Sequence, residues 1–138
     1  MTVKILTDSA CDLPEDILKE YDIDVMPIVV IDNDVEYLDN VTIEPKTLYD
    51  NMRNGKIYKT SQIPINTFQD KFEEIAKEGR STIYIAFSSG LSATYQSAVM
   101  TRDSLKEKYP DLDLTIVDSK SASLGFGILV YTAAKMAK

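Results

Sequence analysis

The stretch STIYIAF, residues 81–87, decides the fold, because it is an almost unbroken run of β-branched and aromatic residues. A strand without polar alternation must be covered on both faces, as the central strands of a parallel sheet are. The segment SSG at 88–90 then turns the chain into a long helix, whose apolar stripe includes Tyr95, Ala98 and Leu105. A buried strand followed directly by a helix is typical of an α/β protein.

Strand and helix signals alternate on both sides of this stretch. Short β-rich runs lie near residues 3–7, 25–31 and 113–117, and helical patterns separate them. This alternation predicts a three-layer α/β/α domain with a mainly parallel sheet. Pro27 has no N–H and is expected at an edge or a bulge. Residues 32–40 begin with turn-forming residues and are expected to leave the sheet as a small β-hairpin or arm.

The final segment, residues 124–138, is expected to be a helix with no clean polar face. Apolar side chains occur all around it, namely Phe126, Ile128, Leu129, Val130, Tyr131, Ala133, Ala134 and Met136. A helix that is apolar on every side is normally buried on every side. We therefore expect residues 1–138 to form an N-terminal domain and a second domain to follow it and cover this helix.

The charge of the chain argues against two classes of partner. Its 22 acidic and 15 basic residues give a formal net charge of −7. A nucleic-acid backbone or an anionic membrane surface would repel such a protein on average. Its apolar runs are far shorter than the about 20 residues that span a bilayer, so no stable membrane insertion is expected. An anionic ligand would have to be held by local donors.

The cysteine and histidine content limits the reactions and metal sites that this chain can support. Cys11 is the single cysteine, which excludes an internal disulfide and fits a reducing compartment. Residues 1–8 lack the apolar segment of a signal peptide, so a cytoplasmic location is expected. The chain has no histidine, which removes Ser-His and Cys-His nucleophiles and histidine metal ligands. Because nucleotide-binding glycine motifs are also missing, we expect no cofactor and no metal.

Hydroxyl-rich segments mark the candidate site. They are TDS at 7–9, TSQ at 60–62, SSGLS at 88–92 and DSKSAS at 118–123. Three of them begin at the carboxyl ends of predicted strands, and TSQ belongs to a polar loop before a helix. In open α/β sheets, ligands bind in the crevice outside these strand ends. The sequence therefore predicts a ligand site at this edge of the sheet.

The SSGLS segment suits an anionic group. Gly90 allows close approach of the backbone, the start of the following helix supplies free N–H groups, and the serines add hydroxyl donors. Together these groups can bind a carboxylate or a phosphate without a cationic side chain. The alternative is that the serines only cap the helix, since serine is a preferred N-cap residue.

Two acidic residues, Asp8 and Asp118, stand at predicted strand ends. They could act as acid-base groups with Lys120, in an enzyme that acts on a small acid or a phosphorylated ligand. They could also accept hydrogen bonds from loop N–H groups, which is the commoner role of acids at such positions.

The four segments resemble, in the same order, the signatures of the DegV family of bacterial fatty-acid-binding proteins. The matching stretches are TDSACDLP at 7–14, TSQ at 60–62, SSGLSATYQSA at 88–98 and DSKSAS at 118–123. Each motif alone is short, so the specificity lies in four concordant matches. The resemblance covers the N-terminal domain of the family from end to end of this chain.

The resemblance implies a second domain and a long-chain fatty acid lying between the two domains. The fatty-acid-binding residues that it implies are Thr60, Ser92, Ser61, Ser89 and Gly90. Thr60 and a serine of SSGLS would hold the carboxylate, and a polar residue of the second domain would complete the site. The chain departs from the family pattern at Ile63, where proline is common, and at Ala93, where glycine is commoner. The departure at Ala93 leaves Ser92 and Ser89 both open as the main ligand.

The expected function is that of a lipid-binding carrier rather than an enzyme. By resemblance, it binds a long-chain fatty acid and presents the carboxylate to a separate fatty-acid kinase for phosphorylation. The first alternative is the enzyme that uses Asp8, Lys120 or Asp118. The second is a regulatory interaction domain without a ligand, which the polar strand-end loops argue against.

Overall fold

The computed structural model describes residues 2–138 and contains two sheets. The main sheet has the strand order β2-β1-β6-β7, and all its strands are parallel. Its members are β1 (Lys4–Asp8), β2 (Asp24–Met26), β6 (Thr82–Ala86) and β7 (Leu114–Asp118). The predicted mainly parallel sheet is confirmed, and the stretch at 81–87 supplies its interior strand β6.

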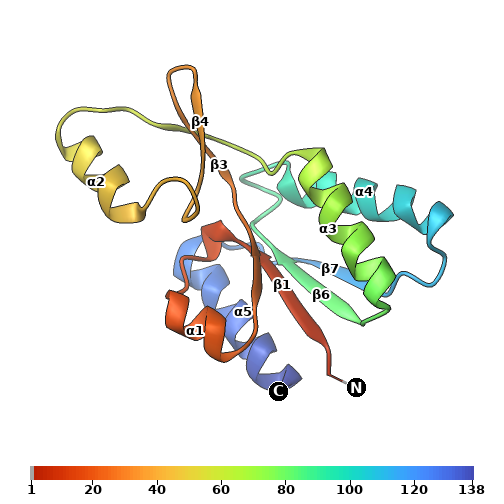
Figure 1. Ribbon diagram of the computed structural model, residues 1–138. Coiled ribbons are helices and arrows are strands. Elements are labelled where there is room, and N and C mark those ends of the chain that lie inside the picture. Colours follow the sequence, from red (N-terminus) through yellow and green to blue (C-terminus); the bar gives the residue numbers. More distant parts are fainter. Residues whose placement is uncertain (1) are drawn as a thin grey trace.

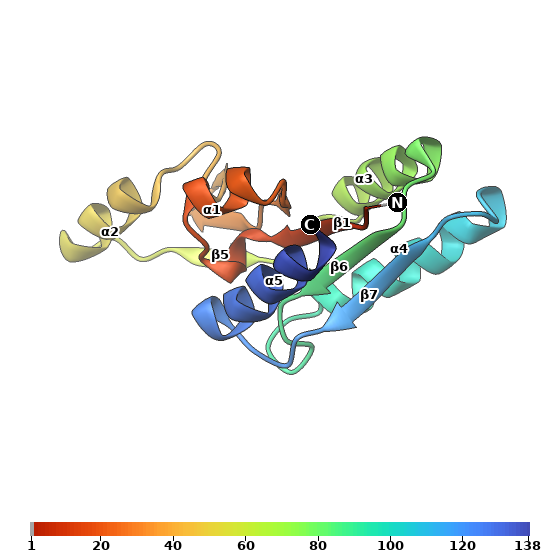
Figure 2. The same cartoon turned by 90° about the horizontal axis from the view of Figure 1, so that it is seen from below.

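Helices cover both faces of the main sheet, as the three-layer prediction requires (Figures 1 and 2). The helices are α1 (Glu15–Glu20), α3 (Ile65–Glu78), α4 (Thr94–Lys108) and α5 (Ser123–Ala137), and a short 3-10 helix, η1 (Ser9–Cys11), follows β1. Residues of α3 and α4 form one buried cluster with the sheet, while α5 forms a second cluster on the other face, with residues of α1 packed against it.

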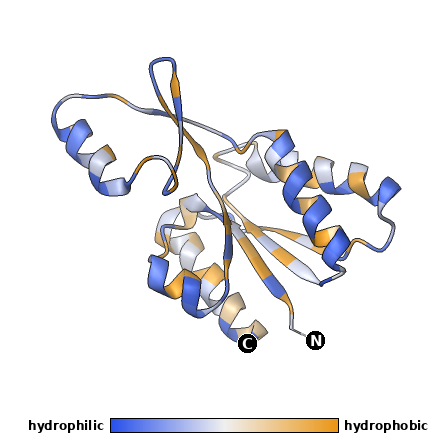
Figure 3. Cartoon of the chain, in the orientation of Figure 1, coloured by the Kyte–Doolittle hydropathy of each residue, from blue (hydrophilic) through white to orange (hydrophobic). Residues whose placement is uncertain are grey.

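The larger cluster is organised around Tyr84 of β6. Its side chain is fully buried, and its ring centroid lies 6.0 Å from that of Phe68 and 6.5 Å from that of Phe72, both of α3. The helical pattern at 65–76 therefore buries its apolar face against the centre of the sheet. Figure 3 shows apolar residues in the strands of the main sheet and many hydrophilic residues along α3.

Helix α5 packs unusually close to η1. A Cβ atom on Gly127 would lie 2.5 Å from the carbonyl oxygen of Cys11, a distance that side chains do not tolerate. Glycine is therefore required at this position. The opposite side of α5 leaves Leu124, Ile128 and Met136 exposed, which agrees with the uninterrupted apolar character of this segment.

The second sheet belongs to an arm that extends away from the main sheet (Figure 1). The arm consists of β3 (Val29–Asp32), β4 (Val35–Leu38), α2 (Pro45–Arg53) and β5 (Lys59–Ser61). Its strands are antiparallel, in the order β4-β3-β5. The predicted hairpin near 32–40 is confirmed, and it turns at Asn33, whose left-handed backbone (φ 54°) suits asparagine.

The prediction of one strand over residues 25–31 is wrong. The chain leaves the main sheet after Met26 and enters the arm at Val29. Pro27 cannot donate a ladder hydrogen bond, and the N–H of Ile28 donates instead to the Ser9 hydroxyl at 3.0 Å. These two residues therefore end one strand and redirect the chain into the other sheet.

Two loop predictions also differ from the structure. Thr60 and Ser61 lie in strand β5 rather than in a loop, because β5 pairs with β3. Helix α4 begins at Thr94 and not directly after Gly90, since the N–H groups of Leu91 and Ser92 turn back to the carbonyl of Ser88.

Candidate functional site

A cavity of about 330 Å³ lies where the arm meets the carboxyl end of the main sheet. Its lining comes from η1, the crossing between β2 and β3, β5 with the residue after it, and the loop after β6 with the start of α4. The lining residues are Ala10, Ile28, Thr60, Ser61, Gln62, Phe87, Leu91, Ser92 and Thr94. The structure thus brings the TSQ and SSGLS segments to one place.

Thr60 and Ser61 reach this cavity from the exposed strand β5. Thr60 is opposite Val30 and Ser61 is opposite Val29 in the ladder with β3, so the pairing fixes their backbone positions. Within residues 2–138, neither hydroxyl makes a hydrogen bond to another residue. Both hydroxyls are therefore free to bind a ligand.

Ser92 lines the same cavity from the loop after β6. Its Oγ accepts the N–H of Thr94 at 3.2 Å and lies 2.9 Å from the Thr94 hydroxyl. This turn orients Ser92 directly before α4. A hydroxyl that accepts a local hydrogen bond can still donate its own proton to a ligand.

Ser89 and Gly90 are not among the residues that line the cavity. The Ser89 hydroxyl donates to Asp118, and the Ser89 N–H donates to Asp118 Oδ1 at 3.1 Å. The Gly90 N–H donates to the Ser88 hydroxyl at 3.2 Å. These groups hold the loop after β6 in place. Between the two candidate serines, Ser92 is the one that faces the same cavity as Thr60.

Asp8 is a buried carboxylate behind the cavity, with an exposed fraction of 0 %. Its Oδ2 accepts the Tyr84 hydroxyl at 3.0 Å and the Phe87 N–H at 3.1 Å, and its Oδ1 accepts the Ala10 N–H at 3.2 Å. Burial raises the pKa of Asp8 to about 6, against the opposing effect of these hydrogen bonds. A fully enclosed group cannot contact a substrate in this conformation.

Asp118 ends β7 on the other side of the same loop. Its Oδ1 also accepts the Lys120 N–H at 3.0 Å, so both carboxylate oxygens serve loop donors. The pKa of Asp118 is lowered, and the hydrogen bond from the Ser89 hydroxyl is the largest cause. Asp8, Asp118 and Lys120 do not gather around the cavity, and the two acids accept loop hydrogen bonds, as the second reading of these positions predicts.

The structure shows no other site of obvious chemistry in its described part. Among residues 2–138 there is no group of three or more His, Cys, Asp or Glu side chains placed to hold a metal ion. Likewise, none of the helices in this range has the length and apolar character needed to cross a membrane.

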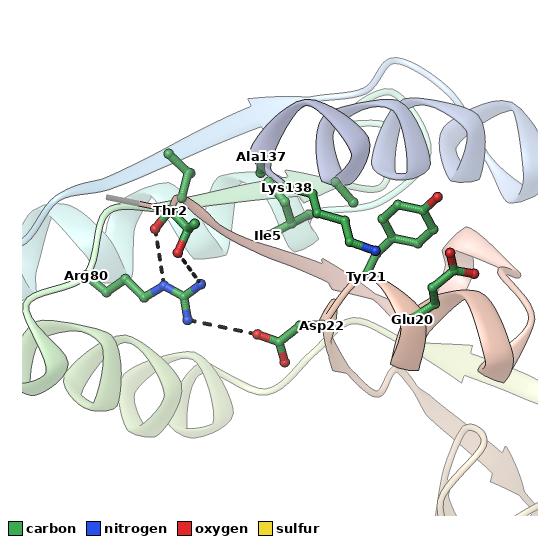
Figure 4. A pocket seen from close by; sticks show the side chains of 10 residues that line it. Thr2, Ile5, Glu20, Tyr21, Asp22, Arg80, Ala137 and Lys138 are labelled. Carbon is green, nitrogen blue, oxygen red and sulfur yellow. Dashed lines mark hydrogen bonds and ion pairs between the residues drawn. The ribbon is translucent and has the colours of Figure 1, made fainter.

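Two further hollows differ from the cavity. Figure 4 shows a hollow of about 200 Å³ at the amino end of the main sheet, where the Arg80 guanidinium donates to Thr2 at 3.2 and 3.3 Å and lies 3.9 Å from Asp22. The Arg80 guanidinium is therefore already paired within the protein. A larger hollow of about 500 Å³ lies near Ser9 and Cys11, between α1 and the arm.

Several lining residues were not predicted from the sequence. They are Ala10, Ile28, Gln62, Phe87, Leu91 and Thr94. All except Ile28 lie within or directly beside the predicted polar segments, so the motifs mark their neighbourhood. Ile28 was hidden because residues 25–31 look like one continuous strand.

The fold and the cavity define an α/β domain with a hydroxyl-lined cavity at the carboxyl end of a parallel sheet. Residues 2–138 match the model of a family described as uncharacterised proteins of the DegV family. The chain belongs to the DegV family, as its four sequence motifs predict.

Relatives extend this result. A DegV domain-containing protein of Clostridium perfringens is 46 % identical over 136 residues, which cover 97 % of this chain and 47 % of the relative. The chain spans about half the length of the curated relatives it matches.

Solved structures show the same fold. A stearic acid-binding protein from Eubacterium ventriosum superposes with a TM-score of 0.92 at 27 % identity, over 97 % of this chain and 47 % of that one. A DegV family protein from Thermus thermophilus, described for its fatty acid binding, superposes with a TM-score of 0.81 at 30 % identity, over 99 % of this chain and 47 % of that one.

Proposed function

We propose that this chain binds the carboxylate of a long-chain fatty acid in the cavity between the arm and the main sheet. The observation that carries the proposal is that Thr60 of β5 and Ser92 of the loop after β6 line one cavity together with Ser61. The Thr60 and Ser92 hydroxyls can donate to one carboxylate without a cationic partner. Fatty-acid binding by the Eubacterium and Thermus proteins of the same fold supports this ligand class.

The apolar part of the lining suits the start of an acyl chain. Ala10, Ile28, Phe87 and Leu91 stand beside the hydroxyls. An acyl chain gains about 0.8 kcal/mol for each buried methylene, so most of its affinity comes from apolar cover rather than from the head group. Polar groups at one end and apolar groups around them are the usual composition of such sites.

We also propose that residues 1–138 act as the N-terminal domain of a two-domain protein. The relatives are about twice as long as this chain, and the outer side of α5 carries exposed Leu124, Ile128 and Met136. A second domain would cover this apolar surface and the rest of the acyl chain. The domain alone is then expected to bind long-chain fatty acids only weakly.

The proposed role is to carry and present a fatty acid in the cytoplasm, not to catalyse a reaction. Phosphoryl transfer needs phosphate-binding loops and a metal site, and the sequence has no Walker-type loop and no kinase glycine-rich loop. A bound carboxylate held in a fixed position would instead be a suitable substrate for a separate fatty-acid kinase.

The test combines the two-domain protein, a fatty acid and Mg²⁺-ATP. We expect no acyl phosphate until the kinase is added. Acyl phosphate or another product formed by the protein alone, and abolished by Asp118→Asn, would establish the enzyme alternative. Solvent extraction of the purified two-domain protein should release a long-chain fatty acid; release of only small polar acids would contradict the carrier function.

A further inference from the structure

We propose that Asp8 is a positioning residue for ligand binding, because its carboxylate holds the backbone of Ala10 and of Phe87 and so sets the separation of two walls of the cavity. This inference rests on the proposed fatty-acid site. Ala10 belongs to η1 and Phe87 to the loop after β6, and both line the cavity. Asp8 lies between them and touches no ligand itself.

The number of donors explains why a carboxylate is needed. Three donors converge on Asp8, two on Oδ2 and one on Oδ1. An ionised carboxylate accepts on both oxygens without donating, whereas a protonated carboxyl group turns one oxygen into a donor. An amide at this position would turn its NH₂ group toward either the Ala10 N–H or the Phe87 N–H. In either orientation, one of the two walls loses its hydrogen bond.

The other side of the same loop is held independently. Asp118 accepts the N–H and the hydroxyl of Ser89, and the Ser88 N–H donates to the Ser121 carbonyl at 3.1 Å. The loop that carries Phe87, Leu91 and Ser92 is thus attached to β7 on one side and to Asp8 on the other. Loss of the Asp8 attachment would free the side of the loop that faces Ala10.

The charge of Asp8 destabilises the fold at neutral pH. Burial raises the pKa of Asp8 from 3.8 to about 6, so the folded protein favours the neutral form. The titratable groups next to it are Tyr84 of β6 and Cys11 of η1; burial raises the pKa of each above its ordinary value, so both stay neutral between pH 5 and pH 7.5. The stabilisation from proton binding at Asp8 is complete below pH 3.8 and is lost as the pH rises through about 6.

Buried groups whose charge lowers stability are typical of functional sites, which agrees with the position of Asp8 between two lining segments of the cavity. Asp8→Asn removes the buried charge and releases one wall. Tyr84→Phe is the matched control, because it removes the third donor and leaves both walls attached. The two variants therefore separate stability from binding.

The experiment uses the two-domain protein with a long-chain fatty acid, followed through the backbone amide signals of Thr60 and Ser92 at pH 7.5. Asp8→Asn should raise the dissociation constant about tenfold, the effect of one hydrogen bond to a charged group. Its melting temperature at pH 7.5 should equal or exceed that of the parent chain. Tyr84→Phe should melt at a lower temperature and bind within about threefold of the parent.

A second readout is the pH dependence of stability. The parent should gain stability between pH 7.5 and pH 5, and Asp8→Asn should show a smaller gain, because burial also raises the pKa of Asp39, which both proteins keep. If the long-chain fatty acid does not shift the amide signals of the parent two-domain protein, the proposed function fails. If the parent binds and Asp8→Asn binds equally well, the positioning role is overturned. Parallel loss of binding and melting temperature in Asp8→Asn would also overturn it, since that pattern indicates a merely structural role.

Discussion

The main sheet and the arm differ in how much of their side-chain surface is buried. Strand β6 buries most of its residues between two helical layers, whereas all three residues of β5 are exposed. Helix α2 of the arm buries none of its residues, although α3 in the main layer buries Phe68, Phe72 and Ile75. The cavity lies between these regions, so one of its walls belongs to a well-packed core and the other to a lightly packed strand.

This difference shows where stability and binding can be altered separately. A change in the core layers should affect the whole fold, because close-packed interiors transmit strain. A change in the arm should affect the ligand and local order, since few apolar contacts hold it.

Gly127→Ala should be the most damaging of these changes. The added Cβ would meet the Cys11 carbonyl at 2.5 Å and force α5 away from η1. We expect the free energy of unfolding to fall by about 3 kcal/mol, the upper part of the range for overpacking. Urea denaturation followed by circular dichroism measures this change.

The control for this change is Gly125→Ala on the same helix. Its Cβ would lie 3.8 Å from Ser121, an ordinary contact. Alanine also favours helix over glycine by up to about 1 kcal/mol, so this variant should be as stable as the parent or more so. Similar losses at both positions would contradict the close packing of α5 on η1.

Removal of one hydroxyl at a time from the cavity should weaken binding and leave the fold intact. Thr60→Val on the arm and Ser92→Ala on the core side should each reduce fatty-acid binding by about 1.5–3 kcal/mol, the range for hydrogen bonds to a charged group. Calorimetric titration of the two-domain protein measures the affinity. Melting temperature should change less for Thr60→Val, whose side chain is exposed.

Ser97→Ala serves as the comparison for these hydroxyls. Ser97 lies on α4 beyond the cavity lining, and its hydroxyl makes a long contact of 3.5 Å with Gln62. This variant should bind almost as well as the parent. Equal losses at Thr60, Ser92 and Ser97 would show that the substitutions act through folding.

Ion pairs should show the smallest difference between core and arm. Lys71 of α3 has a half-buried side chain and pairs with Asp24 at 2.9 Å and Glu74 at 3.1 Å, whereas Lys56 pairs only with Asp32 at 2.7 Å on the exposed arm. Lys71→Ala should lower stability by about 1 kcal/mol, and Lys56→Ala should lower it by less, because the exposed pair is screened by solvent. Thermal denaturation at low and high salt checks both changes; an equal or larger loss for Lys56→Ala would refute the distinction.

The sequence predicts the main sheet well because its signals are local. An apolar strand such as residues 81–87 has one stable environment, and a following glycine and amphipathic helix leave one architecture. Strand β5 could not be predicted in this way, since Lys59, Thr60 and Ser61 have no apolar alternation. Its conformation depends on hydrogen bonds to β3, about thirty residues earlier in the chain.

The candidate site could be predicted from the sequence only in part. The hydroxyl-rich motifs indicate Thr60 and Ser92, because such residues are common where a backbone meets a ligand. Their placement in one cavity depends on the arm folding back toward the main sheet, which no local pattern shows. The proposed positioning role of Asp8 is equally non-local. It depends on hydrogen bonds to two separate segments, which require the register of β1 against β6.

Both ends of the arm are attached to the same interior. Met26, just before it, and Ile63, just after it, are buried in one hydrophobic cluster with Tyr84. The two ends of the arm are therefore held together like the ends of a loop. The entropic cost of closing a loop rises slowly with its length, by about 0.6 kcal/mol for each doubling. Extra residues inserted at the exposed turn after Asn33 would hardly change the global stability, while they would alter the reach of the arm. The number of residues at this turn can therefore differ between proteins of this fold without any change to the core.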